Sequence, residues 1–196
     1  MGFDNYDPSL YENREIQVNK TNIPGLLFID LVLNGDERGW FKESFQKEKL
    51  VGKGFPKEFN PVQLSVSANK FKGVTRGIHA EPWDKFISIQ SGKIFVAIVD
   101  LRKGQTFGEK VTFEMDTSKA IFVPQGCGNS FQTLADDVLY TYHVNKHWSP
   151  EAKYTLVNLA DPDLAIKWPI PLGEAIISDK DKGHPFLKNL KPYAFN

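Results

Sequence analysis

The sequence has few of the residues that crosslink small secreted domains or build metal centres. Its one cysteine, Cys127, excludes an intramolecular disulfide, and only 4 of its 196 residues are histidines. Lysine plus arginine equals aspartate plus glutamate at 24 each, whereas sequence-independent nucleic-acid binding needs a basic surface. No apolar run approaches the roughly 20 residues of a membrane span, and residues 1–20 lack a signal-peptide core. These absences predict a cytoplasmic protein that binds neither nucleic acid nor membrane.

Aromatic and branched apolar residues are plentiful and recur in short runs. Hydrophobic residues make up 41% of the chain and include 15 phenylalanines, which is enough to build a sizeable core. The runs are separated by turn signals such as Asn34-Gly35 and Ser91-Gly92. They cover Leu26–Val32, Val62–Val66, Phe86–Gln90, Lys93–Val99, Lys110–Met115, Ala120–Val123, Ser130–Thr133, Val138–Val144 and Tyr154–Leu159. Many short strands at such spacing predict an all-β sandwich or barrel, of which a jelly roll is one solution.

Helices are expected at two places only. Glu43–Val51 is one candidate, and Ser178–Lys182 is a second, with Ser178 as the N-cap and Asp181 at the third helical position. There is no internal repeat and no linker-like stretch. We therefore expect a single domain over residues 1–196, with an N-terminal arm at 1–23, a barrel core at 24–170 and a C-terminal segment at 171–196.

Two segments match the places where small β-barrels of the cupin class carry their metal ligands. Residues 73–85 offer one histidine, His79, and residues 123–129 end on Asn129 where a ligand histidine would stand. One imidazole does not hold a transition metal, which takes three or four N, O or S ligands. We therefore expect no metal and no other cofactor.

His79 lies between two cations, Arg76 and Lys85. An isolated strand histidine is commonly hydrogen-bonded in a core, but cations facing a barrel mouth are costly unless they meet an anion. The set therefore also suits proton transfer on an anionic substrate such as a sugar nucleotide, since arginine binds phosphate oxygens in pairs. Lys85 is either a solvated charge on an edge strand or a fixed ammonium that stabilises an oxyanion.

Two tyrosines and two aspartates are further candidates. Tyr140 and Tyr142 share one face of a strand, where they fill the core or place one phenol at the barrel mouth as a general acid, and the residues alone do not choose between them. Asp179 and Asp181 suit the first turn of a helix. Contact with His79 would instead make one of them the carboxylate that orients the imidazole.

The remaining candidates are weaker. Residues 36–43 place two pairs of opposite charges around Trp40 and Phe41, which suits either a charged hairpin tip or the binding of a nucleobase. Asn129 is expected to hydrogen-bond within the barrel. His143, His147 and His184 are interpreted as surface or structural residues, because none has metal-like spacing.

Taken in order, several motifs resemble those of one family. They are Gly-Asp-Glu-Arg-Gly-Trp-Phe-Lys-Glu (35–43), Gly-Val-Thr-Arg-Gly-Ile-His (73–79), Val-Asp-Leu-Arg-Lys-Gly (99–104), Thr-Phe-Gly (106–108), Phe-Val-Pro-Gln-Gly (122–126), Ala-Asp-Pro-Asp-Leu-Ala-Ile-Lys-Trp-Pro (160–169) and Ile-Ser-Asp-Lys-Asp (177–181). Together they resemble the dTDP-4-dehydrorhamnose 3,5-epimerase family. The His-Ala-Glu-Pro-Trp-Asp-Lys stretch looks like a compact variant of that family.

The resemblance implies a metal-independent, cupin-like jelly-roll homodimer with exchanged N-terminal strands. Its substrate would be dTDP-4-dehydro-6-deoxy-D-glucose, inverted at C3 and C5 on the route to dTDP-L-rhamnose. By position, the resemblance implies four catalytic residues. They are His79 as the base, Asp181 as its paired carboxylate, Lys85 as the cation near the C4 oxygen, and Tyr142 as the acid. The substrate-binding residues that it implies are Arg38, Glu43, Gln63, Arg76 and Asn129. Asn129 and Ser65 depart from the common family pattern.

Three other functions were weighed. The first is an epimerase that inverts one carbon only or acts on another 4-keto sugar nucleotide. The second is a non-catalytic sugar-nucleotide-binding cupin, which would keep Arg38 and Arg76 without needing the His79–Tyr142 pair. The third, a metal-dependent dioxygenase, is disfavoured by the missing ligands.

Overall fold

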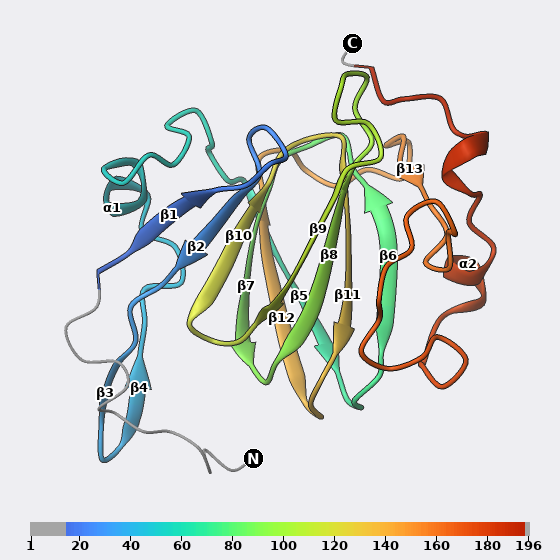
Figure 1. Ribbon diagram of the computed structural model, residues 1–196. Coiled ribbons are helices and arrows are strands. Elements are labelled where there is room, and N and C mark those ends of the chain that lie inside the picture. The colour runs from blue at the N-terminus through green and yellow to red at the C-terminus, as the bar shows by residue number, and fades with distance from the viewer. Residues whose placement is uncertain (1–14, 195–196) are drawn as a thin grey trace.

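Two antiparallel sheets face one another in the computed structural model, which describes residues 15–194 (Figure 1). The strands are β1 (Gln17–Lys20), β2 (Leu27–Asp30), β3 (Asn34–Asp36), β4 (Gly39–Phe41), β5 (Gln63–Asn69), β6 (Thr75–Ala80), β7 (Lys85–Ser91), β8 (Ile94–Asp100), β9 (Lys110–Met115), β10 (Lys119–Val123), β11 (Cys127–Thr133), β12 (Val138–Val144) and β13 (Thr155–Leu156). The helices are α1 (Lys47–Val51), α2 (Asp179–Lys182) and the 3-10 helix η2 (Leu187–Asn189). Most of the predicted arm, residues 1–14, lies outside the described residues.

Neighbours in each sheet are mostly distant in sequence. One sheet has the order β1-β2-β10-β7-β12-β5, the other has the order β13-β6-β11-β8-β9, and β3 and β4 form a separate hairpin. Antiparallel sheets whose chain crosses repeatedly between them are the jelly-roll arrangement. The predicted all-β class with a few short helices is confirmed.

The main core lies between the two sheets. Alternate residues of β7 and β8 point into it, among them Ile87, Ile89, Ile94 and Ile98, all with no exposed surface. The outer face of the six-stranded sheet is covered by Leu50, Phe55 and Phe59 from α1 and the loop that follows. The C-terminal segment covers the outer face of the other sheet around Ile78 and Val99. Parts of both outer faces are therefore covered, and the ends of the space between the sheets are left for a site.

Differences from the predicted elements have local causes. The helix expected at Glu43–Val51 begins only at Lys47, because the side chain of Gln46 caps it by accepting from the backbone N–H of Lys49 at 2.7 Å. The strand expected at Tyr154–Leu159 is reduced to Thr155–Leu156, which pair with β6 at the edge of the sheet.

Strand β6 was not among the predicted runs, and it contains an irregularity that shapes the site. Its pairing with β11 shifts register, since Asn129 faces His79 whereas Phe131 faces Arg76. Residues three apart normally point to opposite faces of a strand, but one extra residue in a bulge restores the same face. Gly77 has φ +124°, and a Cβ there would approach the Ser130 Cβ to 2.5 Å. Glycine at this position therefore lets Arg76 and His79 face the same space.

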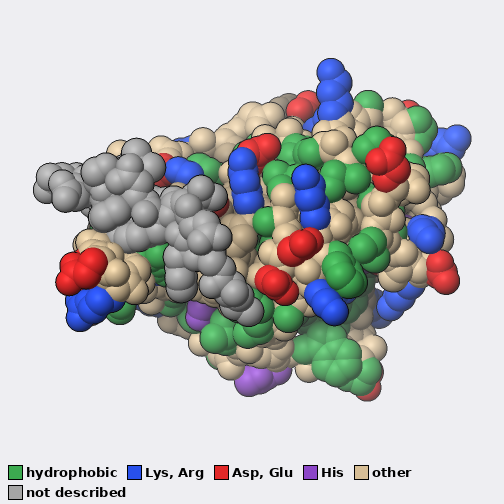
Figure 2. Space-filling model, turned by 90° about the horizontal axis from the view of Figure 1, so that it is seen from below, with side chains coloured by type: hydrophobic (Ala, Val, Ile, Leu, Met, Phe, Trp, Pro, Cys, Tyr) green, Lys and Arg blue, Asp and Glu red, His purple; other side chains and the backbone are tan. Residues whose placement is uncertain are grey.

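The surface is marked by a projecting hairpin and by mixed charge. The β3–β4 hairpin projects from the side of the molecule opposite β6 (Figure 1). Basic and acidic side chains are interspersed over the face seen in Figure 2, which carries no broad patch of one sign. Within residues 15–194, no helix is long and apolar enough to cross a membrane.

Candidate active site

A cavity of about 210 Å³ opens at one end of the space between the sheets. Its lining is polar and aromatic, and comprises Ser67, Arg76, His79, Glu81, Lys85, Asn129, Phe131, Tyr140 and Tyr142. A second cavity of about 590 Å³ shares His79 and Glu81 with it and extends past Trp148, Tyr154 and Asp181. The structure thus brings together five of the nine predicted site residues in one cavity and places a sixth, Asp181, in the adjoining one.

His79 and Asp181 are in contact although 102 positions separate them. The Nε2 atom of His79 lies 2.9 Å from Oδ1 of Asp181. The His79 side chain is 32% exposed and that of Asp181 only 8%, so the imidazole reaches the cavity while the carboxylate lies behind it. A carboxylate in this position fixes the orientation and tautomer of an imidazole.

The end of α2 holds Asp181 in place. The hydroxyl of Ser178 caps the helix by accepting from the Asp181 N–H at 3.1 Å, and Oδ2 of Asp181 accepts from the Gly77 N–H at 3.3 Å. Burial works to raise the pKa of Asp181, but the hydrogen bonds from His79 and Gly77 outweigh it and keep that pKa below the usual range. The group beside His79 is therefore an ionised carboxylate.

Lys85 is buried at the cavity wall with two oxygen partners. Its ammonium lies 2.9 Å from Oε1 of Glu81 and donates to Oδ1 of Asn129. Burial lowers the pKa of Lys85, and the charge and hydrogen bond of Glu81 oppose that effect. Asn129, which the sequence predicts at the place of a cupin ligand histidine, thus helps to hold the Lys85 ammonium in position.

The two tyrosines on β12 have different surroundings. Tyr140 is 5% exposed and stacks on Phe131 with ring centroids 4.5 Å apart, and its hydroxyl accepts from the Asn129 amide at 3.3 Å. Burial raises the pKa of Tyr140 well above its ordinary value. Tyr142 lies one step further along the same face and is partly exposed to the cavity. The environment therefore favours Tyr142 as the phenol that exchanges protons.

Of two further predicted binding residues, Arg76 lines the smaller cavity and Gln63 contacts a residue that lines the larger one. Arg76 is exposed and donates from Nε to Oδ1 of Asn69 at 3.0 Å, so the rest of its guanidinium is available at the mouth. Gln63 lies on the edge strand β5, where its Oε1 accepts from the backbone N–H of Trp148 at 3.0 Å. Trp148 lines the larger cavity, so Gln63 supports that wall.

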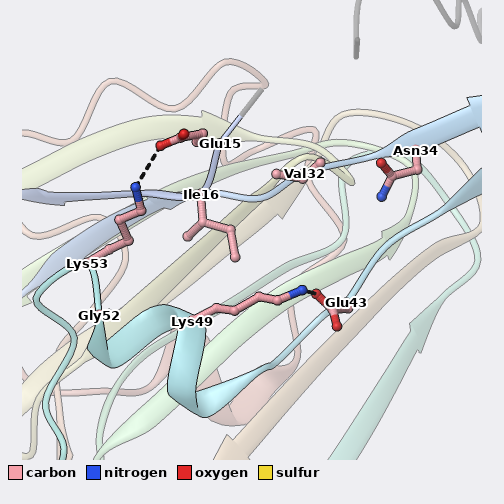
Figure 3. A pocket seen from close by; sticks show the side chains of 8 residues that line it. All are labelled: Glu15, Ile16, Val32, Asn34, Glu43, Lys49, Gly52 and Lys53. Atoms are coloured by element: carbon pink, nitrogen blue, oxygen red, sulfur yellow. Dashed lines mark hydrogen bonds and ion pairs between the residues drawn. The ribbon is translucent and has the colours of Figure 1, made fainter. Parts of the chain in front are cut away.

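Arg38 and Glu43 are not brought to this cavity by their own chain. Arg38 is at the tip of the β3–β4 hairpin, where its only described ion pair is with Asp36. Glu43 lines a separate pocket of about 460 Å³ beside α1 (Figure 3). Both lysines that line this pocket form ion pairs, Lys49 with Glu43 and Lys53 with Glu15 at 2.7 Å. That pocket therefore offers no concentrated charge for a phosphate.

Two residues of the site, Glu81 and His184, were not predicted from the sequence. Glu81 is two positions after His79 on an extended segment, and that spacing was an available signal for a shared face. His184, interpreted as a surface or structural residue, is buried 3.6 Å from Oδ1 of Asp181, three positions along from it. His79, Asp181 and His184 form the one group within residues 15–194 whose ligand atoms are close enough to hold a metal ion.

The geometry supports enolisation of a carbonyl compound. A partly exposed imidazole backed by a carboxylate comes from β6 of one sheet, and a phenol comes from β12 of the other. A base and an acid on opposed walls act on opposite faces of a ring held between them. The fixed ammonium of Lys85 lines the same cavity and suits a developing oxyanion.

Known proteins with similar sequences agree with this chemistry. The family model described as dTDP-4-dehydrorhamnose 3,5-epimerase matches residues 20–189. A protein RmlC homolog from Streptococcus pyogenes is 49% identical over 87% of this chain and 88% of its own. A dTDP-4-dehydro-6-deoxyglucose 3-epimerase from a Streptomyces species is 33% identical over 85% and 86%.

A solved structure gives the same result for the fold. RmlC from Streptococcus suis, in complex with dTDP-D-xylose, superposes with a TM-score of 0.87 at 49% identity, covering 92% of this chain and 95% of that chain. The region that the family model matches includes strands β2 to β13 and every candidate residue from Arg38 to Asp181. The chain therefore belongs to the dTDP-4-dehydrorhamnose 3,5-epimerase family of isomerases.

Proposed function

We propose that the protein inverts C3 and C5 of dTDP-4-dehydro-6-deoxy-D-glucose to give dTDP-4-dehydro-L-rhamnose, in dTDP-L-rhamnose biosynthesis. The observation that carries the proposal is the placement of His79 and Tyr142 on facing sheets around one cavity, with Lys85 in its wall. A binding protein of the same fold has no need of an ionised carboxylate 2.9 Å behind an imidazole.

Each residue has one step in this reaction. The C4 ketone acidifies the hydrogens on both neighbouring carbons, and His79 removes one of them while Asp181 stabilises the imidazolium that forms. Lys85 stabilises the enolate oxygen at C4. Tyr142 then delivers a proton to the opposite face of the carbon, which inverts it. His79 then releases its proton to solvent and Tyr142 regains one, and a second round at the other carbon completes the double epimerisation; no step calls for a cofactor.

Solvent-deuterium incorporation into dTDP-4-dehydro-6-deoxy-D-glucose, followed by NMR at each carbon, tests the proposal. We expect label at both C3 and C5. Label at one carbon would instead support the narrower activity, for which the name of the Streptomyces relative is the specific reason. No label at either carbon would overturn the assignment of an epimerase and favour a binding protein.

We further propose that the single domain functions as a homodimer in which the hairpin of one chain completes the site of the other. Leu64 and Val66 are 56% and 62% exposed on the outer face of the edge strand β5, an apolar surface typical of an interface. Arg38, whose side chain is 83% exposed, is at the tip of the β3–β4 hairpin and does not line its own chain's cavity. The diphosphate of a partner-bound substrate would satisfy it.

Complementation between two impaired variants, assayed at substrate concentrations well below the KM of Arg38→Ala, tests the dimer. We expect Arg38→Ala to raise KM for the substrate strongly and His79→Ala to abolish turnover in separate samples. Mixed dimers then contain one site with both defects and one with neither, so activity should return to about half the wild-type value per mixed dimer. A monomeric mass in light scattering, or no recovery after proven subunit exchange, would rule out the shared site.

The pH dependence of turnover reports the state of Lys85. Burial lowers the pKa of Lys85, and Glu81 opposes that effect by stabilising the ammonium. The ammonium is therefore present at low pH and is lost as pH rises through the lowered pKa. We expect kcat to fall on the alkaline side, and Glu81→Gln to move that fall to lower pH. Lys85→Met should cost roughly 10²–10³-fold in kcat at neutral pH. If kcat of Glu81→Gln falls at the same alkaline pH as kcat of the wild type, Glu81 does not stabilise the Lys85 ammonium.

A further inference from the structure

His184 is a buried histidine that the proposed reaction does not use. Only 4% of its side chain is exposed, and neither ring nitrogen makes a hydrogen bond of normal geometry within the described residues. Buried polar atoms in folded proteins are nearly always paired, because an unpaired one loses its hydration without replacement. Burial lowers the pKa of His184, and the groups close to the ring, Oδ1 of Asp181 and the backbone carbonyls of Val157 and Gly77, oppose that effect. These groups accept hydrogen bonds and so cannot satisfy the lone pair of a neutral imidazole, which is what a metal would take.

The unpaired ring faces two other ligand atoms. Nε2 of His184 lies 3.6 Å from Oδ1 of Asp181, which itself lies 2.9 Å from Nε2 of His79. All three ligand atoms lie within 4.8 Å of one another. Ligand atoms at 2.0–2.1 Å from a tetrahedral zinc are about 3.3 Å apart, so small side-chain rotations bring this set around one ion.

The three residues also offer the rest of a metal site. The backbone N–H of Gly77 already holds Oδ2 of Asp181, which leaves Oδ1 directed at both imidazoles. His79 is 32% exposed and lines both cavities, so an ion has a path from solvent and a fourth coordination position open to the cavity. Two imidazoles with one carboxylate suit zinc, whereas magnesium and calcium prefer oxygen ligands throughout.

We propose that His79, Asp181 and His184 form an inhibitory binding site for Zn²⁺ and similar divalent transition metals. The bound ion takes the place of the proton on His79 Nε2, which is released to solvent, and neutralises the charge of Asp181. The remaining ring proton of the neutral imidazole then lies on Nδ1, so His79 no longer has a free nitrogen to accept a proton from the substrate. The binding site stands on geometry alone, whereas its inhibitory effect rests on the proposed function of His79.

Binding is tested first, on the full chain treated with a chelator and freed of nucleotide. Zn²⁺ is titrated against a chromophoric competitor, and Co²⁺ is used to read tetrahedral coordination from its visible absorption. We expect one ion per chain with tetrahedral cobalt bands. His184→Gln should lower the affinity at least about 10–100-fold, the usual cost of disturbing a metal's surroundings. The exposed histidine His147 supplies the matched control, and His147→Gln should bind like the wild type.

Folding of the variants is checked by circular dichroism, and His184→Asn serves as a second replacement should His184→Gln unfold. Equal Zn²⁺ affinity in the wild type and in a folded His184 variant would overturn the site, as would the absence of stoichiometric binding to the wild type.

Turnover is measured next at the same metal concentrations. We expect wild-type activity to fall in proportion to the bound ion and to return with excess chelator, and we expect a His184 variant to resist the ion. Because the substrate diphosphate also binds Zn²⁺, the His147→Gln enzyme is assayed at identical substrate and metal concentrations. Zn²⁺ that binds through His184 without slowing turnover would leave the site in place and refute His79 as the base, so the two failures are distinguishable.

Discussion

Replacing His79 by alanine is expected to lower deuterium incorporation at both carbons roughly 10²–10⁴-fold, the usual contribution of a general base. The expectation follows from position, since His79 alone among the cavity residues combines partial exposure with a buried carboxylate 2.9 Å behind it. Loss at C3 and C5 together is expected because a single cavity offers a single imidazole to both carbons. The measurement is the NMR rate of label uptake at each carbon.

Asp181→Asn and His147→Ala are the controls for this result. The amide keeps the shape of Asp181 but has one acceptor oxygen in place of two, so it accepts from either Gly77 or His79 and no longer carries the charge that stabilises the imidazolium. His79 itself stays in place, so a smaller loss than in His79→Ala is expected. His147→Ala removes an exposed imidazole and should leave the rate unchanged. Calorimetry with dTDP confirms that each variant still binds nucleotide. Label uptake near the wild-type rate in His79→Ala would show that another group is the base.

The strand pattern was predictable because it depends on alternation within a few residues. Lys110–Met115 and Val138–Val144 have the predicted bounds, and the cap of α2 follows from Ser178. Strand β6 was harder to predict because Gly77 and its neighbouring charges interrupt the alternation. The bulge that turns Arg76 and His79 to one side depends on pairing with β11, which is not a local property.

The candidate site shows the same division between local and long-range causes. A family resemblance suggested the pairing of His79 with Asp181, but the residues alone left Asp181 as a helix-start acid. Glu81 beside Lys85 follows from β6 continuing in extended form, which a period of two predicts once the strand is known. The contact of His184 with Asp181 requires the C-terminal segment to fold over the five-stranded sheet, and composition carries no signal for that.

The choice between Tyr140 and Tyr142 as the acid is the second result with a large expected effect. Both phenols are on the inner face of β12, opposite the sheet that carries His79. Tyr140 is stacked on Phe131, and its hydroxyl is hydrogen-bonded to Asn129, which also accepts from Lys85. These contacts fix the position of Tyr140 in the cavity wall. Tyr142 has a partly exposed ring in the same cavity, and the family resemblance predicts that it is the acid.

Tyr142→Phe should therefore lower formation of the inverted product roughly 10²–10⁴-fold while deuterium still enters the recovered substrate, because His79 removes and returns a proton on its own face without the phenol. Tyr140→Phe should weaken binding or packing through the freed Asn129 amide and keep the ratio of inversion to exchange. Both rates come from one NMR time course, in which label in the substrate and label in the product are separate signals. The opposite pattern in the two variants would make Tyr140 the acid, and equal loss of exchange and inversion in Tyr142→Phe would mean that Tyr142 positions the substrate rather than protonating it.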